Sequence, residues 1–112
     1  MHEMALCECL VEIMEQEAAS GGFHRVHSVS LEVGPLAGVE RDALRFGFQA
    51  VTPGTLADGA VLRIVGALAQ ARCPSCGWQS TLSRPISLCP VCDELLNVSG
   101  GCELRITEME VE

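Results

Sequence analysis

The sequence predicts an α+β fold in which a small sheet and two helices form one domain, with a cysteine-rich segment extruded from it as a second module. Three observations support this prediction: helical and strand-like periodicities alternate up to about residue 70, four cysteines form two matching turns, and residues 102–112 are again strand-like. We expect the first domain to comprise residues 1–70 and 102–112, and the extruded module to comprise residues 71–101.

The two helices are recognised by apolar residues that recur at a spacing of three or four. The first is expected from Glu3 to about Ser20, where two glycines follow and end it. Its opposite face carries three acidic residues, Glu8, Glu12 and Glu15. The second is expected from Glu40 to Val51, although Gly47 disfavours it by roughly 1 kcal/mol. Its inner side would carry Ala43, Leu44, Phe48 and Val51.

Three strand-like segments complete the first domain. Val29, Leu31 and Val33 alternate with polar residues, which predicts a strand with one buried face and with Ser28 and Ser30 on the other. Residues 60–73 are mostly aliphatic and predict one long strand that leads into Cys73 and is buried on both faces for part of its length. The last strand changes its apolar parity, so we expect a bulge near Thr107 and a return to the sheet.

Composition restricts the class of function. The 112 residues include 15 acidic and 7 basic side chains, and the formal charge of −8 argues against binding to nucleic acid or anionic lipid. Such a surface suits protein partners or cationic ligands. No apolar stretch approaches the roughly 20 residues of a membrane span, and no signal-peptide pattern is present, so we expect a cytoplasmic protein.

Four of the seven cysteines have the spacing of a metal site. Cys73 and Cys76 lie in "CPSC", and Cys89 and Cys92 lie in "CPVC". Two such turns place four thiolates at the corners of a tetrahedron, which favours structural Zn(II) over iron or over two disulfides. Residues 71–101 contain few hydrophobic residues, so we expect this zinc-ribbon-like module to depend on its metal for folding.

The residues around these turns lead to further expectations. Gly77 follows the first pair and suits a positive φ, whereas Asp93 holds the equivalent place after the second pair and should be strained. The other three cysteines do not fit the site by spacing, and we expect small buried or half-buried thiols at Cys7, Cys9 and Cys102. We expect His24 and His27 to be ordinary surface histidines.

The segment "MHE" offers a second, nitrogen-rich metal site. A free amine, a backbone nitrogen and the imidazole of a histidine at position 2 can form fused chelate rings that suit Ni(II) or Cu(II). By itself, a single terminal histidine is a weak signal.

The opening "MHEM", the two Cys-Pro-x-Cys turns and the terminal "GCELRITEMEVE" together resemble the HypA/HybF family of hydrogenase nickel-incorporation proteins. The resemblance implies a non-enzymatic metallochaperone whose Met1, His2 and Glu3 bind nickel as transient cargo, in a nickel-binding α+β domain. It implies that the four cysteines hold structural zinc. It also implies that the protein works with the GTPase HypB to load nickel into the large subunit of [NiFe]-hydrogenase. The sequence leaves a homodimer open.

Two other interpretations remain. A zinc-ribbon adaptor that binds nucleic acid or protein, without a nickel function, would explain the cysteines, but the segment lacks a basic, aromatic face. A rubredoxin-like iron carrier would also explain the cysteines but leaves the terminal "MHE" unexplained, and its visible absorption would distinguish it from a zinc protein.

Overall fold

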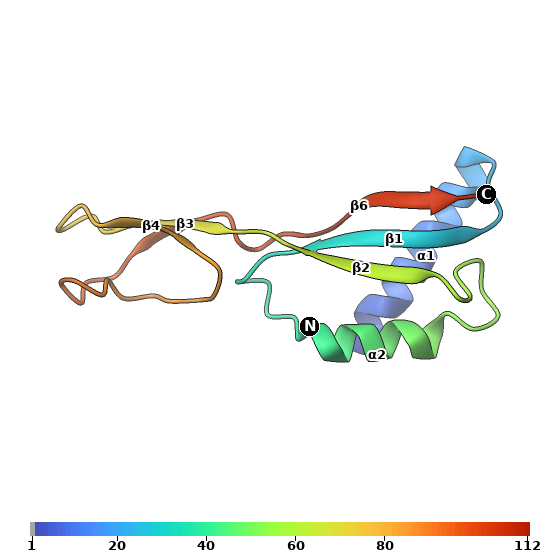
Figure 1. The fold of residues 1–112 in the computed structure, drawn as a ribbon, viewed down its shortest axis with the longest axis horizontal. Helices are drawn as coiled ribbons and strands as arrows, with labels where there is room; N and C mark the ends of the chain where they lie inside the picture. The colour runs from blue at the N-terminus through green and yellow to red at the C-terminus, as the bar shows by residue number, and fades with distance from the viewer. Residues whose placement is uncertain (1) are drawn as a thin grey trace. The chain divides into compact units, whose positions relative to one another are not determined.

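The computed structural model describes residues 2–112, which form two helices and two three-stranded sheets (Figure 1). In chain order the elements are α1 (Glu3–Gly21), β1 (Val26–Val33), α2 (Arg41–Val51), β2 (Val61–Gly66), β3 (Ala69–Arg72), β4 (Gln79–Leu82), β5 (Asn97–Ser99) and β6 (Leu104–Val111). The strand orders are β2-β1-β6 and β4-β3-β5. This architecture confirms the predicted α+β fold.

Helices α1 and α2 pack closely because a glycine stands at their contact. The Cys7 thiol of α1 is fully buried and donates a hydrogen bond to the Leu44 carbonyl of α2 at 3.3 Å. A Cβ atom at Gly47 would lie 3.0 Å from the Cys7 Sγ, which is tighter than ordinary van der Waals contact. Gly47 therefore lowers the intrinsic helix propensity of α2 but permits the approach of α1.

Strand β1 lies at the centre of the first sheet, between β2 and β6. The Glu112 N–H donates to the Arg25 carbonyl, and the Gly34 N–H donates to the Glu103 carbonyl, so β6 runs antiparallel to β1. The chain therefore returns to the first sheet after the cysteine-rich segment, as predicted. The chain passes from β1 to β2 through α2.

The prediction that β1 buries only one face is wrong. Val29, Leu31 and Val33 are at most 2% exposed, but Ser28 and Ser30 are also buried. Because β1 is the central strand, side chains from its two neighbours, β2 and β6, help to cover these serines. The Ser28 hydroxyl donates to the Glu110 carboxylate at 2.8 Å and accepts from the Arg63 guanidinium at 3.0 Å.

The prediction of one long strand over residues 60–73 is also wrong. The segment breaks at Ala67 and Leu68 into β2 and β3, which belong to different sheets. Strand β2 is not buried on both faces, since Val61 is 54% exposed and Val65 is 45% exposed. Its position at the edge of the first sheet explains this exposure. The bulge expected near Thr107 stays a prediction.

The second sheet has a small core. Strand β3 pairs antiparallel with β4, from Ala69 opposite Leu82 to Arg72 opposite Gln79, and with β5 on its other side. Its buried hydrophobic cluster comprises only Ala69, Ala71 and Leu82. Four partly buried side chains pack against this cluster: Leu36, Trp78, Ile86 and Leu96.

The chain divides into two compact units. The first consists of Met1–Leu31, Val39–Ile64 and Ile106–Glu112. The second consists of Glu32–Gly38 and Val65–Arg105, and it contains all four cysteines of the two turns. Within residues 2–112, no helix has the length and apolar character needed to cross a membrane.

Candidate metal centres

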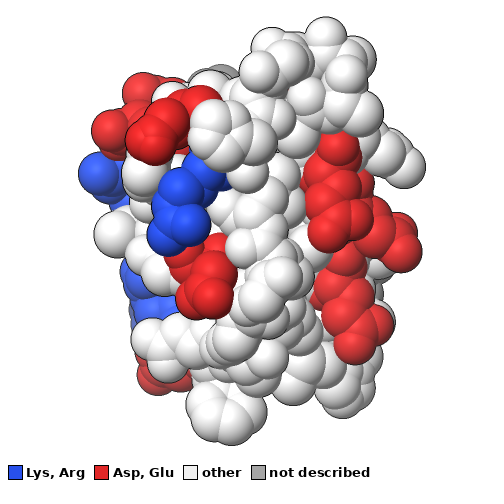
Figure 2. Space-filling view, turned by 90° about the vertical axis from the view of Figure 1, so that its right-hand side faces the viewer, with Lys and Arg blue, Asp and Glu red and all other residues white. Residues whose placement is uncertain are grey.

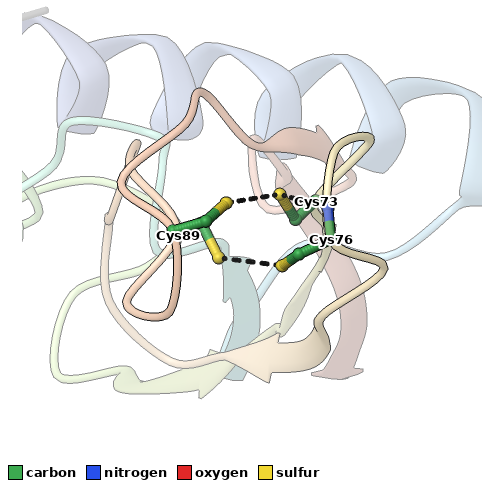
Figure 3. Close-up of side chains that lie close together, drawn as sticks. Cys73, Cys76 and Cys89 are labelled. Atoms are coloured by element: carbon green, nitrogen blue, oxygen red, sulfur yellow. Dashed lines mark hydrogen bonds between the residues drawn. The ribbon is translucent and has the colours of Figure 1, made fainter.

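The structure brings Cys73, Cys76, Cys89 and Cys92 together, and their four sulfur atoms lie within 4.8 Å of one another. The Cys73 and Cys92 sulfurs are 3.4 Å apart, and the Cys76 and Cys89 sulfurs are 3.7 Å apart. Figure 3 shows the side chains of Cys73, Cys76 and Cys89 converging from two separate loops. Each pair of cysteines therefore contributes to one common cluster.

Both cysteine turns have the same backbone arrangement. The Cys73 N–H donates to the Trp78 carbonyl, and the Gly77 N–H donates back to the Cys73 carbonyl. In the second turn, Cys89 makes the corresponding bonds with the Glu94 carbonyl and the Asp93 N–H. Gly77 has φ +80° and Asp93 has φ +65°, which confirms that Asp93 adopts the strained left-handed conformation.

The sulfur cluster fits a tetrahedral thiolate site. Zn–S bonds of about 2.3 Å imply sulfur–sulfur distances of roughly 3.8 Å, close to the two distances observed. Hydrogen bonds from backbone N–H groups, chiefly that of Cys76, lower the pKa of the Cys73 thiol. At Cys92 the Glu94 N–H acts in the same direction, but the hydrogen bond to Cys73 and burial outweigh it and raise the pKa. Four adjacent thiolates repel one another, so a bound cation would stabilise their charged forms.

The second predicted site lies where α1 begins. Met1, the first of its three expected ligands, lies outside the described residues. His2 is the N-cap of α1, and its exposed imidazole Nδ1 accepts a hydrogen bond from the Met4 N–H at 3.2 Å. Glu3 is the first helical residue, and its backbone nitrogen is among the helix N–H groups that have no carbonyl partner within the helix.

The Glu3 carboxylate connects the beginnings of the two helices. It accepts a hydrogen bond from the Glu40 N–H at 3.2 Å, which is the main cause of its lowered pKa. Glu40 is itself the N-cap of α2 and accepts from the N–H groups of Asp42 and Ala43. The sequence predicts Glu40 as the first residue of this helix but not as its cap. The local signal for such a cap is an acidic residue directly before the first turn of a helix. Its carboxylate can then accept hydrogen bonds from the N–H groups two and three residues later, which have no carbonyl partner within the helix.

The remaining cysteines and histidines do not form a further metal cluster. Within residues 2–112, the four-cysteine cluster is the only group of three or more His, Cys, Asp or Glu side chains that lie close enough together to share an ion. Cys7 is buried, as predicted, and burial raises its pKa to about 11, so its thiol is uncharged at neutral pH. The predicted burial is wrong for Cys9 and Cys102, which are exposed. His27 is exposed and lies 3.5 Å from a Glu112 carboxylate oxygen.

Many acidic side chains are exposed on the surface. In the face shown in Figure 2, acidic side chains alone form a band along the right-hand side, while acidic and basic side chains lie together on the left. The exposed residues of α1 include the three predicted glutamates, Glu8, Glu12 and Glu15, and also Glu17. This charge distribution is unfavourable for nucleic-acid phosphates.

Comparison with known proteins identifies the family. Residues 1–111 match the family described as "Hydrogenase/urease nickel incorporation, metallochaperone, hypA". The chain belongs to the HypA family. The hydrogenase maturation factor HypA of Alkalilimnicola ehrlichii is 51% identical over the full length of both chains. The HypA of Acidithiobacillus ferrooxidans is 48% identical, again over both full lengths. The resemblance of the sequence to the HypA/HybF family is therefore confirmed, and the chain is a member of a nickel metallochaperone family.

Solved structures of the family share the fold. The solution structure of the nickel metallochaperone HypA from Helicobacter pylori superimposes with a TM-score of 0.68 and 20% sequence identity. The similarity covers 99% of this chain and 97% of that one. A second solution structure of a HypA protein gives a TM-score of 0.67 and covers 100% of this chain. At these identities the comparison supports the fold.

Proposed function

We propose that this protein binds Ni(II) at its N-terminus and delivers it, together with the GTPase HypB, to the large subunit of [NiFe]-hydrogenase in the cytoplasm. The observation that carries the proposal is the match to a nickel-incorporation family over nearly the entire chain. Relatives that match this chain over its full length bear the name hydrogenase maturation factor, which supports hydrogenase as the protein that receives the nickel. The protein holds and transfers an ion and catalyses no reaction.

The proposed nickel ligands are the Met1 amine, the His2 backbone and imidazole nitrogens, and the Glu3 backbone nitrogen. Two structural observations support this set. The His2 imidazole is exposed, so an ion can reach it from solvent. The Glu3 backbone nitrogen lies in the first turn of α1, where losing its proton breaks no hydrogen bond within the helix. Such a nitrogen-rich set suits Ni(II).

The proposed role of Cys73, Cys76, Cys89 and Cys92 is to hold one structural Zn(II). A closed set of four thiolates leaves no open position for a substrate, so zinc here stabilises the fold. We further propose that residues 71–101 form a module that folds around this ion. The small core of the second sheet, with three buried hydrophobic residues, supports this dependence.

Calorimetric titration with nickel tests the proposed N-terminal site. The native chain is compared with a variant that carries one extra N-terminal residue, which moves the amine away from the imidazole. We expect one tight nickel site in the native chain and a large loss of affinity in the extended chain, with zinc content unchanged in both. Since protons compete for the same nitrogens, nickel affinity should also fall between pH about 8 and about 6.

The outcome that contradicts the proposal is equal affinity and stoichiometry in the two chains, because the amine would then not be a ligand. His24→Ala is a matched control, since His24 is also exposed but lies beyond the end of α1. It should bind nickel as tightly as the native chain.

A further inference from the structure

Exposed hydrophobic side chains are concentrated around the second cysteine turn. Leu88 is 46% exposed, Val91 and Leu95 are each 69% exposed, and Val98 is 36% exposed. Leu88 and Leu95 face each other across an antiparallel bridge, so their side chains stand next to each other on one side of the hairpin. We call the surface formed by Leu88, Val91, Leu95 and Val98 the hairpin face.

The fold does not require leucine at these exposed positions. The hairpin backbone is fixed by hydrogen bonds between the Cys89 N–H and the Glu94 carbonyl and between the Leu96 N–H and the Ser87 carbonyl. Cys89 points inward and is only 2% exposed, so its neighbour Leu88 points outward, as does its bridge partner Leu95. A cluster of apolar side chains that the fold does not need indicates a contact surface.

An apolar groove lies beside this face. Its volume is about 340 Å³, and six of its seven lining residues are hydrophobic: Leu36, Pro85, Ile86, Leu95, Leu96 and Val98. The seventh is Ser87, and no charged residue lines the groove. Leu95 and Val98 belong to both the groove and the hairpin face, so the two surfaces are continuous. A groove of this size can accept one bulky apolar side chain of a partner.

The charges at the tip of the hairpin favour a basic partner. Asp93 and Glu94 are exposed at the tip of the same hairpin. The tetrathiolate zinc site proposed above would add a formal charge of −2 directly beneath it. Two copies of this chain meeting through the hairpin face would bring these like charges together, which argues against self-association here. A segment with an apolar residue flanked by Lys or Arg complements both the groove and the acidic tip of the hairpin.

We propose that the hairpin face and its groove dock a basic segment of a partner protein that inserts one bulky apolar side chain. This inference does not depend on nickel binding at the N-terminus. It rests on the proposed zinc site only for part of the negative charge.

The test selects phage-displayed random dodecapeptides on the zinc-loaded full chain and then measures the affinity of a synthesised consensus peptide. We expect enriched peptides with one large apolar residue among Lys or Arg. Leu95→Ser should weaken consensus binding about tenfold or more. Phe46→Ser is the matched control, because Phe46 is also 69% exposed but lies on α2 in the other compact unit, and it should bind normally.

Additional measurements show whether the hairpin face binds a basic segment or a second copy of this chain. Asp93→Asn combined with Glu94→Gln should weaken consensus binding and reduce its salt dependence. No enrichment, enrichment of acidic peptides, or equal binding by native and Leu95→Ser protein would overturn the proposal. Concentration-dependent dimerisation of the native chain that Leu95→Ser abolishes would also overturn it, in favour of a second copy. Zinc content, measured for each variant, shows whether any loss comes from the metal site instead.

Discussion

Two substitutions at His2, one to alanine and one to asparagine, should lower nickel affinity equally but change stability differently. In the metal-free protein the His2 Nδ1 accepts the Met4 N–H at 3.2 Å and caps α1. Alanine removes this cap and should cost about 1 kcal/mol of stability, whereas asparagine is a good N-cap and should keep stability within a few tenths of a kcal/mol. Neither variant retains an imidazole for nickel.

The same nitrogen atom serves both roles. The imidazole nitrogen that can close a chelate ring with the backbone nitrogen of the same residue is Nδ1, because Nε2 is too distant. A lone pair that binds nickel cannot also accept the Met4 N–H. Nickel binding should therefore release this cap and speed hydrogen exchange at the Met4 amide.

Chemical denaturation gives the two stabilities, calorimetry gives the nickel affinities, and amide exchange follows Met4 with and without nickel. If His2→Asn binds nickel as tightly as the native chain, the imidazole is not a ligand. If His2→Ala is as stable as His2→Asn, the cap contributes nothing. If nickel slows exchange at the Met4 amide, the proposed competition for Nδ1 is refuted. His24→Ala should match the native chain in all three measurements.

The other predictions concern zinc, helix packing and acid stability. Cys89→Ala or removal of zinc should unfold residues 71–101 and leave the helices protected, and unchanged amide protection in that segment after verified zinc loss would contradict this. Gly47→Ala should destabilise the protein by about 1–3 kcal/mol through its clash with the Cys7 Sγ, and adding Cys7→Ala should recover part of the loss, as denaturant titrations would show. The Ser28 hydroxyl and then Arg63 hold the pKa of Glu110 below its ordinary value of 4.5, so this carboxylate stabilises the fold above that pH and less as the pH falls through its lowered pKa. The stability difference between native protein and Glu110→Gln should accordingly shrink on acidification, and a difference that does not shrink as the pH is lowered would show another cause.

Features encoded in short stretches of sequence were predicted well. The bounds of α1 and α2 follow from apolar spacing and from residues that begin and end helices, and the structure places them within about one residue of expectation. The left-handed conformation of Asp93 followed from comparing two turns of the same pattern. Each of these predictions depends on neighbours within a few positions in the chain.

Features that depend on distant neighbours were missed. The burial of Ser28 and Ser30 arises from strands on both sides of β1, one of which lies about 80 residues away at Glu110. The break at Ala67 separates two strands whose partners belong to different sheets. Cys7 and Cys9 are two residues apart, yet one is buried and the other exposed, because α2 covers only one side of α1.

The sequence by itself determined which side chains can bind metal, since the spacing within each Cys-x-x-Cys turn and the "MHE" order are local properties of the chain. It also determined the family through this pattern. The structure brings the two cysteine turns together in one cluster, as their spacing predicted. Only the tertiary structure decided that His2 caps α1 and that Leu88 and Leu95 remain outside the small core. These facts depend on how separate segments pack, and packing is set by the competition of all apolar side chains for a limited interior.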